Sequence, residues 1–446
     1  MFSFTKNWFG GAKANPIGVD FGSDCLKMAQ VSWVNGEPQL IAAAAAEVPS
    51  HIRHNGPGRL AFFAETARDL LTTGGFKGRA VVLALPAASM FIQHLRLAKM
   101  DDELLRKALP WEARGKLPID PSHAVMRHLI AGEIYHDSEP KNEIILMAAA
   151  RELVKQFLGA AAKAKIDVVG MGVEPSAIVD CFGHVYNRVE DKSAIHCYVD
   201  IGCASSRAII AQGSHILFAR CIKVGGEHFN RAVASKLGLN IEDAKMLRIK
   251  LCYQQAPGQA ATQVEDGHEK AFEESPSAAE TAARAPRASS SFRVGGGNDE
   301  QGGGVATAAY ESRASSAKKG PVALPADPQA QQKLVEDAIR DPLTQLVSEL
   351  TQCRHYYEST FPNKPVQRLI FVGGEAKQRT LCHHIASEMS LAAQVGDPLV
   401  RMGRTTEVGI ESGMDRRQAQ PGWAVAIGLT LGPTADSQII APSEAK

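Results

Sequence analysis

An acidic residue, a glycine-containing turn and a lysine lie close together near the start of the chain. Ile17–Val31 reads IGVDFGSDCLKMAQV, with Asp20 in a short apolar run, Gly22 and Ser23 in a turn, and Lys27 in the next run. A buried strand rarely tolerates an unpaired carboxylate, so Asp20 is expected at the mouth of a site. Glycine lets backbone N–H groups approach an anion, and Ser23 adds a hydroxyl donor. These groups suit a metal-bound phosphate, although an ordinary hairpin with a polar turn has the same composition.

The same arrangement occurs a second time in the chain. Tyr198–Ala211 reads YVDIGCASSRAIIA, and its acid (Asp200), glycine (Gly202) and base (Arg207) each lie 180 positions after their counterparts (200 against 20, 202 against 22, 207 against 27). A chance hairpin seldom repeats its polar residues in register. Two such hairpins that face each other can hold one polyphosphate and its metal ion from both sides.

These segments resemble the two phosphate segments of the actin-like ATPase superfamily, whose duplicated ribonuclease-H-like lobes hold ATP between them. Further stretches resemble the PilM family of type IV pilus assembly proteins, in that family's order. They are LAKMDDELLRKALPWEARGKLPID (97–120), NEIILMAAARELV (142–154), VGMGVEPSAIV (169–179), RCIKVGGEHFNRAV (220–233), LNIEDAKMLR (239–248), LIFVGGEAKQ (369–378), GDPL (396–399) and WAVAIGLTL (423–431). The resemblance covers most of residues 17–431.

The resemblance implies an α/β fold of two ribonuclease-H-like lobes with a small inserted α+β (SHS2-like) subdomain. It implies ATP and Mg²⁺ as cofactors, with Asp20 and Asp200 acting on the metal through bound water. Both phosphate turns, a helix start, a helix face and a second glycine pair are expected to contact the nucleotide. The residues are Asp20, Gly22, Ser23, Lys27, Asp200, Gly202, Ser205, Gly225, Gly226, Glu227, Glu242, Lys245, Gly373 and Gly374.

Glu174 is the candidate for chemistry on water. Glu174-Pro175 follows an apolar run and opens the next predicted helix, where proline suits the first turn. A carboxylate there is also favoured by the helix dipole without any further role. The resemblance implies a position near the γ-phosphate, so we expect Glu174 to orient water or metal. The sequence leaves open whether ATP is turned over, and at most a slow ATPase is expected.

The sequence is expected to divide into two lobes and an inserted subdomain. Three further segments, an arm, an insertion and a tail, are expected outside these folded parts. Residues 254–330 are rich in Ala, Gly, Ser, Glu and Pro, which predicts disorder because little apolar surface is available for burial. The expected parts are an arm (1–16), part of the first lobe (17–89), the inserted subdomain (90–149), connecting helices (150–190), the second lobe (191–253), the disordered insertion (254–330), the remainder of the second lobe (331–433) and a tail (434–446).

Within the inserted subdomain, one predicted helix combines a clear start with an interruption. Asp101 is a suitable N-cap for a helix that runs to Ala113. Pro110 is expected to kink this helix or to start a new turn. The apolar residues expected on one face of the helix are Leu104, Leu105, Ala108 and Trp111.

Charge and composition exclude several classes of partner. The net charge is +1, so no strong attraction to nucleic acid or anionic lipid is expected. The 8 cysteines show no zinc-ligand spacing and fit reduced thiols in a cytosol. No apolar run is long enough to span a membrane, so the chain is expected to be cytoplasmic and to reach a membrane only through a partner.

The resemblance implies what that partner is. In relatives a groove between the first lobe and the subdomain binds a peptide, so we expect the N-terminal cytoplasmic peptide of a PilN-like protein at the inner membrane. Self-association is a further option. Alternative functions on the same core are a polymerising FtsA-like cell-division ATPase, a cytoplasmic type II secretion component, and a kinase or other enzyme. The tail lacks the basic amphipathic helix by which the cell-division relatives attach.

Overall fold

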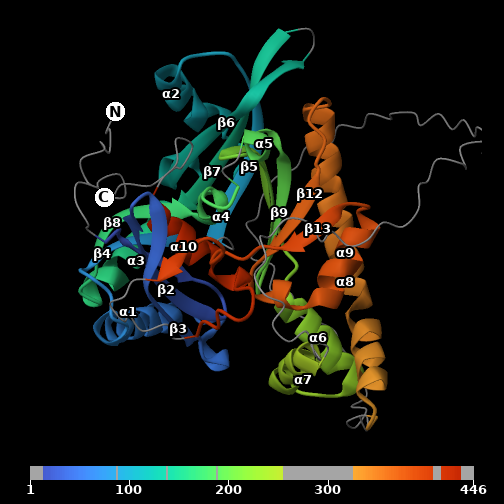
Figure 1. Ribbon diagram of the computed structural model, residues 1–446. Helices are drawn as coiled ribbons and strands as arrows, with labels where there is room; N and C mark the ends of the chain where they lie inside the picture. The colour runs from blue at the N-terminus through green and yellow to red at the C-terminus, as the bar shows by residue number, and fades with distance from the viewer. Residues whose placement is uncertain are drawn as a thin grey trace, which may run out of the picture.

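The computed structural model describes residues 14–86, 89–136, 139–186, 189–254, 325–404 and 413–432. Three predicted segments fall wholly or largely outside this part of the chain: the arm, the low-complexity insertion and the tail. The two lobes, the inserted subdomain and the helices between them are described, and Figure 1 shows their arrangement.

The first lobe is built on a sheet of mixed direction. Its strand order is β14-β3-β2-β1-β4-β8, and the strands are β1 (Ile17–Phe21), β2 (Cys25–Val34), β3 (Glu37–Glu47), β4 (Ala80–Leu85), β8 (Asp167–Val173) and β14 (Gly403–Arg404). β1 is buried along its whole length, as its apolar run predicts. Helices α1 (Gly56–Thr73) and α3 (Arg151–Lys163) pack together over an apolar cluster that includes Phe21, Phe63 and Phe157.

The second lobe repeats this sheet. Its order is β11-β10-β9-β12-β13, with β9 (Ile195–Ile201), β10 (Ser206–Gln212), β11 (His215–Ile222), β12 (Arg368–Val372) and β13 (Ala392–Val395). In each lobe the first strand pairs antiparallel with the next strand and parallel with a later one. Asp20 lies opposite Lys27 in the first hairpin, and Asp200 lies opposite Arg207 in the second. The predicted duplicated α/β fold is confirmed.

Four described helices belong to the second lobe after β11, and the longest runs along one side of the molecule (Figure 1). They are α6 (Gly226–Leu237), α7 (Ile241–Gln254), α8 (Pro328–Thr360) and α9 (Arg379–Glu388). α8 begins at Pro328 with Asp327 as its N-cap, so the helix reaches into the end of the segment predicted to be disordered. The short helix α5 (Val189–Ser193) leads into β9.

The inserted subdomain is a three-stranded sheet covered by one helix. Its order is β5-β7-β6, with β5 (Met90–Ala98), β6 (Ala124–His136), β7 (Glu139–Ala150) and α2 (Asp102–Glu112). Asp101 caps α2 as predicted, since its carboxylate accepts a hydrogen bond of 2.8 Å from the Leu104 N–H. α2 continues through Pro110, which lies in its last turn and cannot donate a backbone hydrogen bond to the turn before it.

The predicted apolar face of α2 is wrong in two of its members. Leu105 and Leu109 are buried against the sheet, and Ala113 follows them at the same spacing. Leu104 is 54% exposed and Trp111 is 67% exposed. A helix can bury only one stripe against a flat sheet, and residues four apart fill it, so the other apolar pair faces solvent.

A buried carboxylate joins the subdomain to the second lobe. Glu143 of β7 binds the His94 ring at 3.0 Å, the Arg96 guanidinium at 3.2 Å and the hydroxyl of Tyr356 on α8 at 2.7 Å. Burial alone would raise the pKa of Glu143, but these hydrogen bonds lower it below its usual value. The other ring nitrogen of His94 contacts the carbonyl oxygen of Ala219 on β11 at 3.1 Å.

The end of the described chain returns to the first lobe. Helix α10 (Ala424–Leu431) packs on β1, β2 and α4 (Glu174–Phe182), and all its residues are buried. β14 pairs with β3 at the edge of the first sheet. Residues 331–433 were expected in the second lobe, so this part of the range differs from the expectation. Among the described residues, no helix is both long and apolar enough to cross a membrane.

Candidate functional site

A cavity of about 1290 Å³ lies between the lobes, and both repeated turns line it. Eleven of the predicted site residues line this cavity: Asp20, Gly22, Ser23, Lys27, Glu174, Asp200, Gly202, Ser205, Lys245, Gly373 and Gly374. Four do not line it: Gly225, Gly226, Glu227 and Glu242. The fold thus brings together the turns that follow β1 and β9, the matching strands of the two sheets.

The first turn is held from behind by an arginine. Arg59 of α1 donates to the carbonyl oxygens of Gly22 and Ser23, each at 2.9 Å. In a planar trans peptide the N–H points opposite to the C=O. The N–H groups of Ser23 and Asp24 therefore point away from Arg59. Both residues line the cavity.

The second turn is held at the same two positions by a helix start. The N–H of Gly226 donates to the Gly202 carbonyl at 2.9 Å, and the N–H of Glu227 donates to the Cys203 carbonyl at 2.8 Å. These carbonyls lie 180 positions after those that Arg59 holds. The N–H groups of Cys203 and Ala204 therefore point away from α6. Each turn presents its amides in the same way, which is an arrangement suited to anions.

This geometry explains why the glycine pair lies behind the turn and does not line the cavity. A Cβ on Gly225 would lie 2.6 Å from the carbonyl oxygens of both Gly202 and Cys203, so only glycine fits there. The sequence predicted direct nucleotide contact for Gly225, Gly226 and Glu227. Their N–H groups are engaged within the protein, with Gly225 donating to the His228 ring at 3.2 Å.

Asp20 is a buried carboxylate with little local compensation. It is 8% exposed, and no hydrogen bond or ion pair joins its carboxylate to another described residue. Burial raises its pKa above the usual value, although the charges of Lys27 and Arg207 act in the opposite direction. The Lys27 ammonium group donates instead to the carbonyl oxygen of Gly422, at 2.6 Å.

Asp200 is in a different electrostatic state. One nitrogen of Arg207 lies 2.6 Å from an Asp200 oxygen, and a second lies 2.6 Å from an oxygen of Glu174. Both carboxylate side chains are 5% exposed. Burial alone would lower the pKa of Arg207, but the charges of Glu174 and Asp200 outweigh this effect and raise the pKa above its usual value. From the sequence, Arg207 was recognised only as the counterpart of Lys27. Its position opposite Asp200 in the hairpin was the signal that could have indicated the ion pair.

The second glycine pair passes close to Asp200. Gly373 has a φ of +88°, and a Cβ there would lie 2.3 Å from an Asp200 oxygen. The Cβ position of Gly374 has no atom within 4 Å, so the backbone is open there to a ligand.

Two charged residues near this pair were not predicted as site residues. Glu375 forms an ion pair with Arg248 at 2.5 Å, and Arg248 also donates to Asn230 at 2.6 Å. Glu375 and Asn230 line the cavity, and buried Arg248 holds them in place. Both charged residues lie in stretches of family resemblance, which was the only signal available.

The helix pair Glu242 and Lys245 is engaged across the cavity mouth. Lys245 lies 3.1 Å from an oxygen of Asp24, and Glu242 lies 3.4 Å from Arg53. The sequence assigned both to the nucleotide, and in the structure each contacts a residue of the opposite lobe. Lys245 lines the cavity and Glu242 does not.

The residues present are compatible with a hydrated magnesium ion. No group of three or more His, Cys, Asp or Glu side chains among the described residues could enclose a metal. Mg²⁺ keeps most of its waters and needs only one or two carboxylates beside the phosphates of a nucleotide. Asp20 fits this requirement, because a cation nearby would compensate its buried charge. Asp200 can contribute only while sharing its charge with Arg207.

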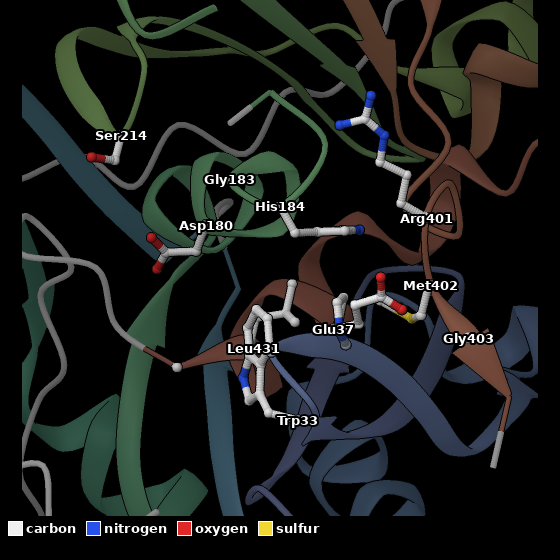
Figure 2. Close-up of a pocket in the computed structure, with 13 residues that line it drawn as sticks. Trp33, Glu37, Asp180, Gly183, His184, Ser214, Arg401, Met402, Gly403 and Leu431 are labelled. Atoms are coloured by element: carbon white, nitrogen blue, oxygen red, sulfur yellow. The ribbon is translucent and has the colours of Figure 1, made fainter. Parts of the chain in front are cut away.

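A second cavity, of about 770 Å³, lies by the turns that follow β2 and β10, and Figure 2 shows residues that line it. Trp33, Glu37, Asp180 and His184 line it, and none of the predicted site residues does. Burial lowers the pKa of His184, which favours its neutral ring. The Arg401 guanidinium points away from Trp33 in Figure 2 and donates to a backbone carbonyl at 3.1 Å. This surrounding does not suit a polyphosphate.

Comparisons with known proteins agree with the fold. The sequence profile of the family described as type IV pilus assembly protein PilM matches residues 18–264. A solved PilM–PilN type IV pilus biogenesis complex is 18% identical, with a TM-score of 0.64 over 94% of this chain and 98% of that chain. That likeness shows the fold. No curated protein matches.

Two further solved structures are more distant. The ethanolamine utilization protein EutJ from Carboxydothermus hydrogenoformans is 11% identical, with a TM-score of 0.46 over 94% of this chain and 89% of that chain. Component A of the (R)-2-hydroxyglutaryl-CoA dehydratase of Acidaminococcus fermentans is 10% identical, with a TM-score of 0.39 over 93% and 96%. The family profile covers more than half of the 446 residues, and the chain therefore belongs to the type IV pilus assembly protein PilM family.

Proposed function

We propose that this chain is a nucleotide-binding scaffold of type IV pilus assembly that holds Mg-ATP between its lobes. The observation that carries the proposal is the repeated turn. In both lobes the carbonyls at matching positions are held from behind, by Arg59 in one and by the start of α6 in the other. The turn amides are thereby directed away from these supports, at a cavity wide enough for a nucleotide.

In this proposal the protein supplies a cradle for phosphate and metal. The amides of Ser23 and Cys203 donate to phosphate oxygens, and Lys27 exchanges the Gly422 carbonyl for phosphate as a mobile point charge. Bound Mg²⁺ would neutralise phosphate charge, with Asp20 and Asp200 receiving hydrogen bonds from its waters. Gly374 lets the backbone approach the adenosine.

Any ATP turnover is expected to be slow. Glu174 is the residue proposed to orient water, and its carboxylate is tied to Arg207 at 2.6 Å. A carboxylate held by a guanidinium is a weaker proton acceptor, because the positive charge favours its ionised form. A turnover of about 10 per second, typical of metabolic enzymes, would contradict this expectation. So would a measured turnover that is unchanged in Glu174→Gln.

We further propose that the chain captures the N-terminal cytoplasmic peptide of a PilN-like protein and so works at the cytoplasmic face of the inner membrane. The similar solved structure is a PilM–PilN complex, which supports the choice of partner. The proposed place is the groove between the first lobe and the inserted subdomain. The three-stranded sheet β5-β7-β6 has strands at both edges, and an extended peptide can bind a strand edge through its main chain.

Binding of that peptide by the full chain tests the partner. A fluorescently labelled peptide from the PilN-like protein of the same organism is titrated and its anisotropy measured, with a scrambled peptide as the control. Saturable binding of the native peptide alone is expected, together with slower amide exchange within Met90–Ala150. Equal binding of both peptides, or protection confined to α7, would contradict the proposal.

A further inference from the structure

The first phosphate turn carries an acidic side chain that the second turn lacks. Asp24 follows Ser23 in the first turn, and the residue 180 positions later is Ala204. The two turns are otherwise built and supported alike. The Asp24 carboxylate is therefore not needed to shape the turn. Its charge also opposes any anion that the turn amides bind, because like charges at short range repel.

Asp24 is instead paired with cations from both sides of the cavity. Arg53, in its own lobe, lies 2.6 Å from one carboxylate oxygen. Lys245, on α7 of the other lobe and 221 positions away in sequence, lies 3.1 Å from the second oxygen and 3.3 Å from the first. All three line the cavity, and we refer to Asp24, Arg53 and Lys245 as the cleft triad.

The cleft triad is sheltered compared with the contacts beside it. The side chains of Arg53, Lys245 and Asp24 are 12%, 16% and 28% exposed. Beside them, Arg53 contacts Glu242 at 3.4 Å and His54 contacts Glu227 at 2.9 Å, but Glu242 is 49% exposed and His54 is 67% exposed. Exposed pairs contribute little to stability, so the cleft triad is the main electrostatic link across the mouth.

The two cations of the cleft triad are fixed and charged. Burial alone would lower the pKa of Lys245, but the Asp24 carboxylate raises it above the usual value. Arg53 is also anchored by a hydrogen bond of 3.3 Å to the Val48 carbonyl. Within the triad one carboxylate faces two cations, and the half-exposed Glu242 is a further carboxylate in contact with Arg53.

We infer that Asp24 is an internal anion that occupies Arg53 and Lys245 until the polyphosphate of a nucleotide displaces it and takes both cations. The inference rests on the proposed nucleotide site and adds Arg53 to it as a phosphate-binding residue. Before nucleotide binds, the contact between Asp24 and Lys245 holds the mouth of the cleft together. After exchange, the phosphate forms this link between the lobes.

The substitution Asp24→Ala tests the inference because it copies the residue of the second turn. It releases both cations, so we expect magnesium-bound N-methylanthraniloyl-ATP to associate about two- to fivefold faster and to bind correspondingly tighter. Asp415→Ala is the matched control, since Asp415 is another carboxylate that lines the cavity, and its ion-pair partner is Arg417 and no member of the cleft triad. It should change the association rate less than Asp24→Ala does.

Two measurements on the full chain complete the test. Stopped-flow fluorescence gives the association rate, and amide exchange without nucleotide reports whether residues 50–56 and 241–251 loosen in Asp24→Ala. Faster association together with faster exchange supports the inference. If the wild type binds the analogue but association is slower or unchanged in Asp24→Ala, the inference is overturned and the proposed function is not. Unchanged exchange also overturns it, whereas a wild type that binds no analogue overturns the proposed function.

Discussion

Asp20 and Asp200 hold the same register position in two repeated hairpins, yet among the described residues only Asp200 has an ion-pair partner. Asp200 shares Arg207 with Glu174, whereas Lys27, opposite Asp20, donates to a backbone carbonyl. The two carboxylates therefore differ in what they need. Asp200 is compensated within the protein, and Asp20 is compensated best by a cation bound in the cavity.

Asp20→Asn is predicted to stabilise the protein without ligand. Burial raises the pKa of Asp20 above 3.8, so its ionised form is disfavoured in the fold at neutral pH. An acid with a raised pKa in the fold loses stability as pH rises from its unfolded pKa through its folded pKa. Removing the charge should therefore raise the free energy of unfolding at pH 7, by about 0.5–2 kcal/mol as for other relieved functional sites.

Thermal melting of both proteins between pH 4 and pH 8 checks this prediction. The advantage of Asp20→Asn should shrink as pH falls towards 4, where Asp20 itself becomes protonated. Asp200→Asn is the matched comparison and should not stabilise, because it removes a partner of the buried Arg207. Equal or lower melting temperatures for Asp20→Asn at pH 7 would show that its carboxylate is compensated already.

Arg207→Ala is predicted to destabilise the protein by about 3–5 kcal/mol, the usual result of breaking a buried ion pair from one side. The loss leaves Glu174 and Asp200 as uncompensated buried carboxylates. In a Glu174→Gln, Asp200→Asn background the same substitution should cost much less. Urea unfolding of the four proteins measures both losses. An equal loss in both backgrounds would mean that the three side chains are not coupled.

Two adjacent leucines on α2 give a test of the inserted subdomain. Leu105 is 1% exposed and packs on the sheet, so Leu105→Ala should cost about 2–5 kcal/mol. Leu104 is 54% exposed, so Leu104→Ala should stay within about 0.5 kcal/mol of the wild type. Chemical denaturation followed by circular dichroism compares them. Similar losses of stability for the two variants would mean that α2 does not bury Leu105 in preference to Leu104.

Much of the fold could be predicted because its signals are local. The strand Ala80–Leu85 is an apolar run ended by Pro86, and the repeat shows itself in the constant offset of its polar residues. What failed depends on partners distant in sequence. The apolar residues of α10 indicate burial but not against which sheet, so its packing on the first lobe could not be predicted.

The candidate site also shows that local signals could be predicted and contacts between distant segments could not. Residues within each hairpin line the cavity, because the strand register carries them there. The Gly225-Gly226 pair was placed against the nucleotide, since a glycine pair indicates close approach but not which group approaches. Lys245 was assigned to the nucleotide on the family resemblance, and its contact with Asp24, 221 positions away, has no local signal.

Calorimetric titration of the full chain with ATP, with and without Mg²⁺, tests the central claim most directly. The comparison is between the wild type, Asp20→Asn and the surface control Glu133→Gln, whose carboxylate is 42% exposed on the inserted subdomain. Thermal melting of the same samples shows whether Asp20→Asn is folded, so that weaker binding by this variant is not mistaken for unfolding. We predict magnesium-dependent binding by the wild type and the control, and binding weaker by about tenfold or more by Asp20→Asn. Equal affinity of all three proteins, or no binding by the wild type, would contradict it.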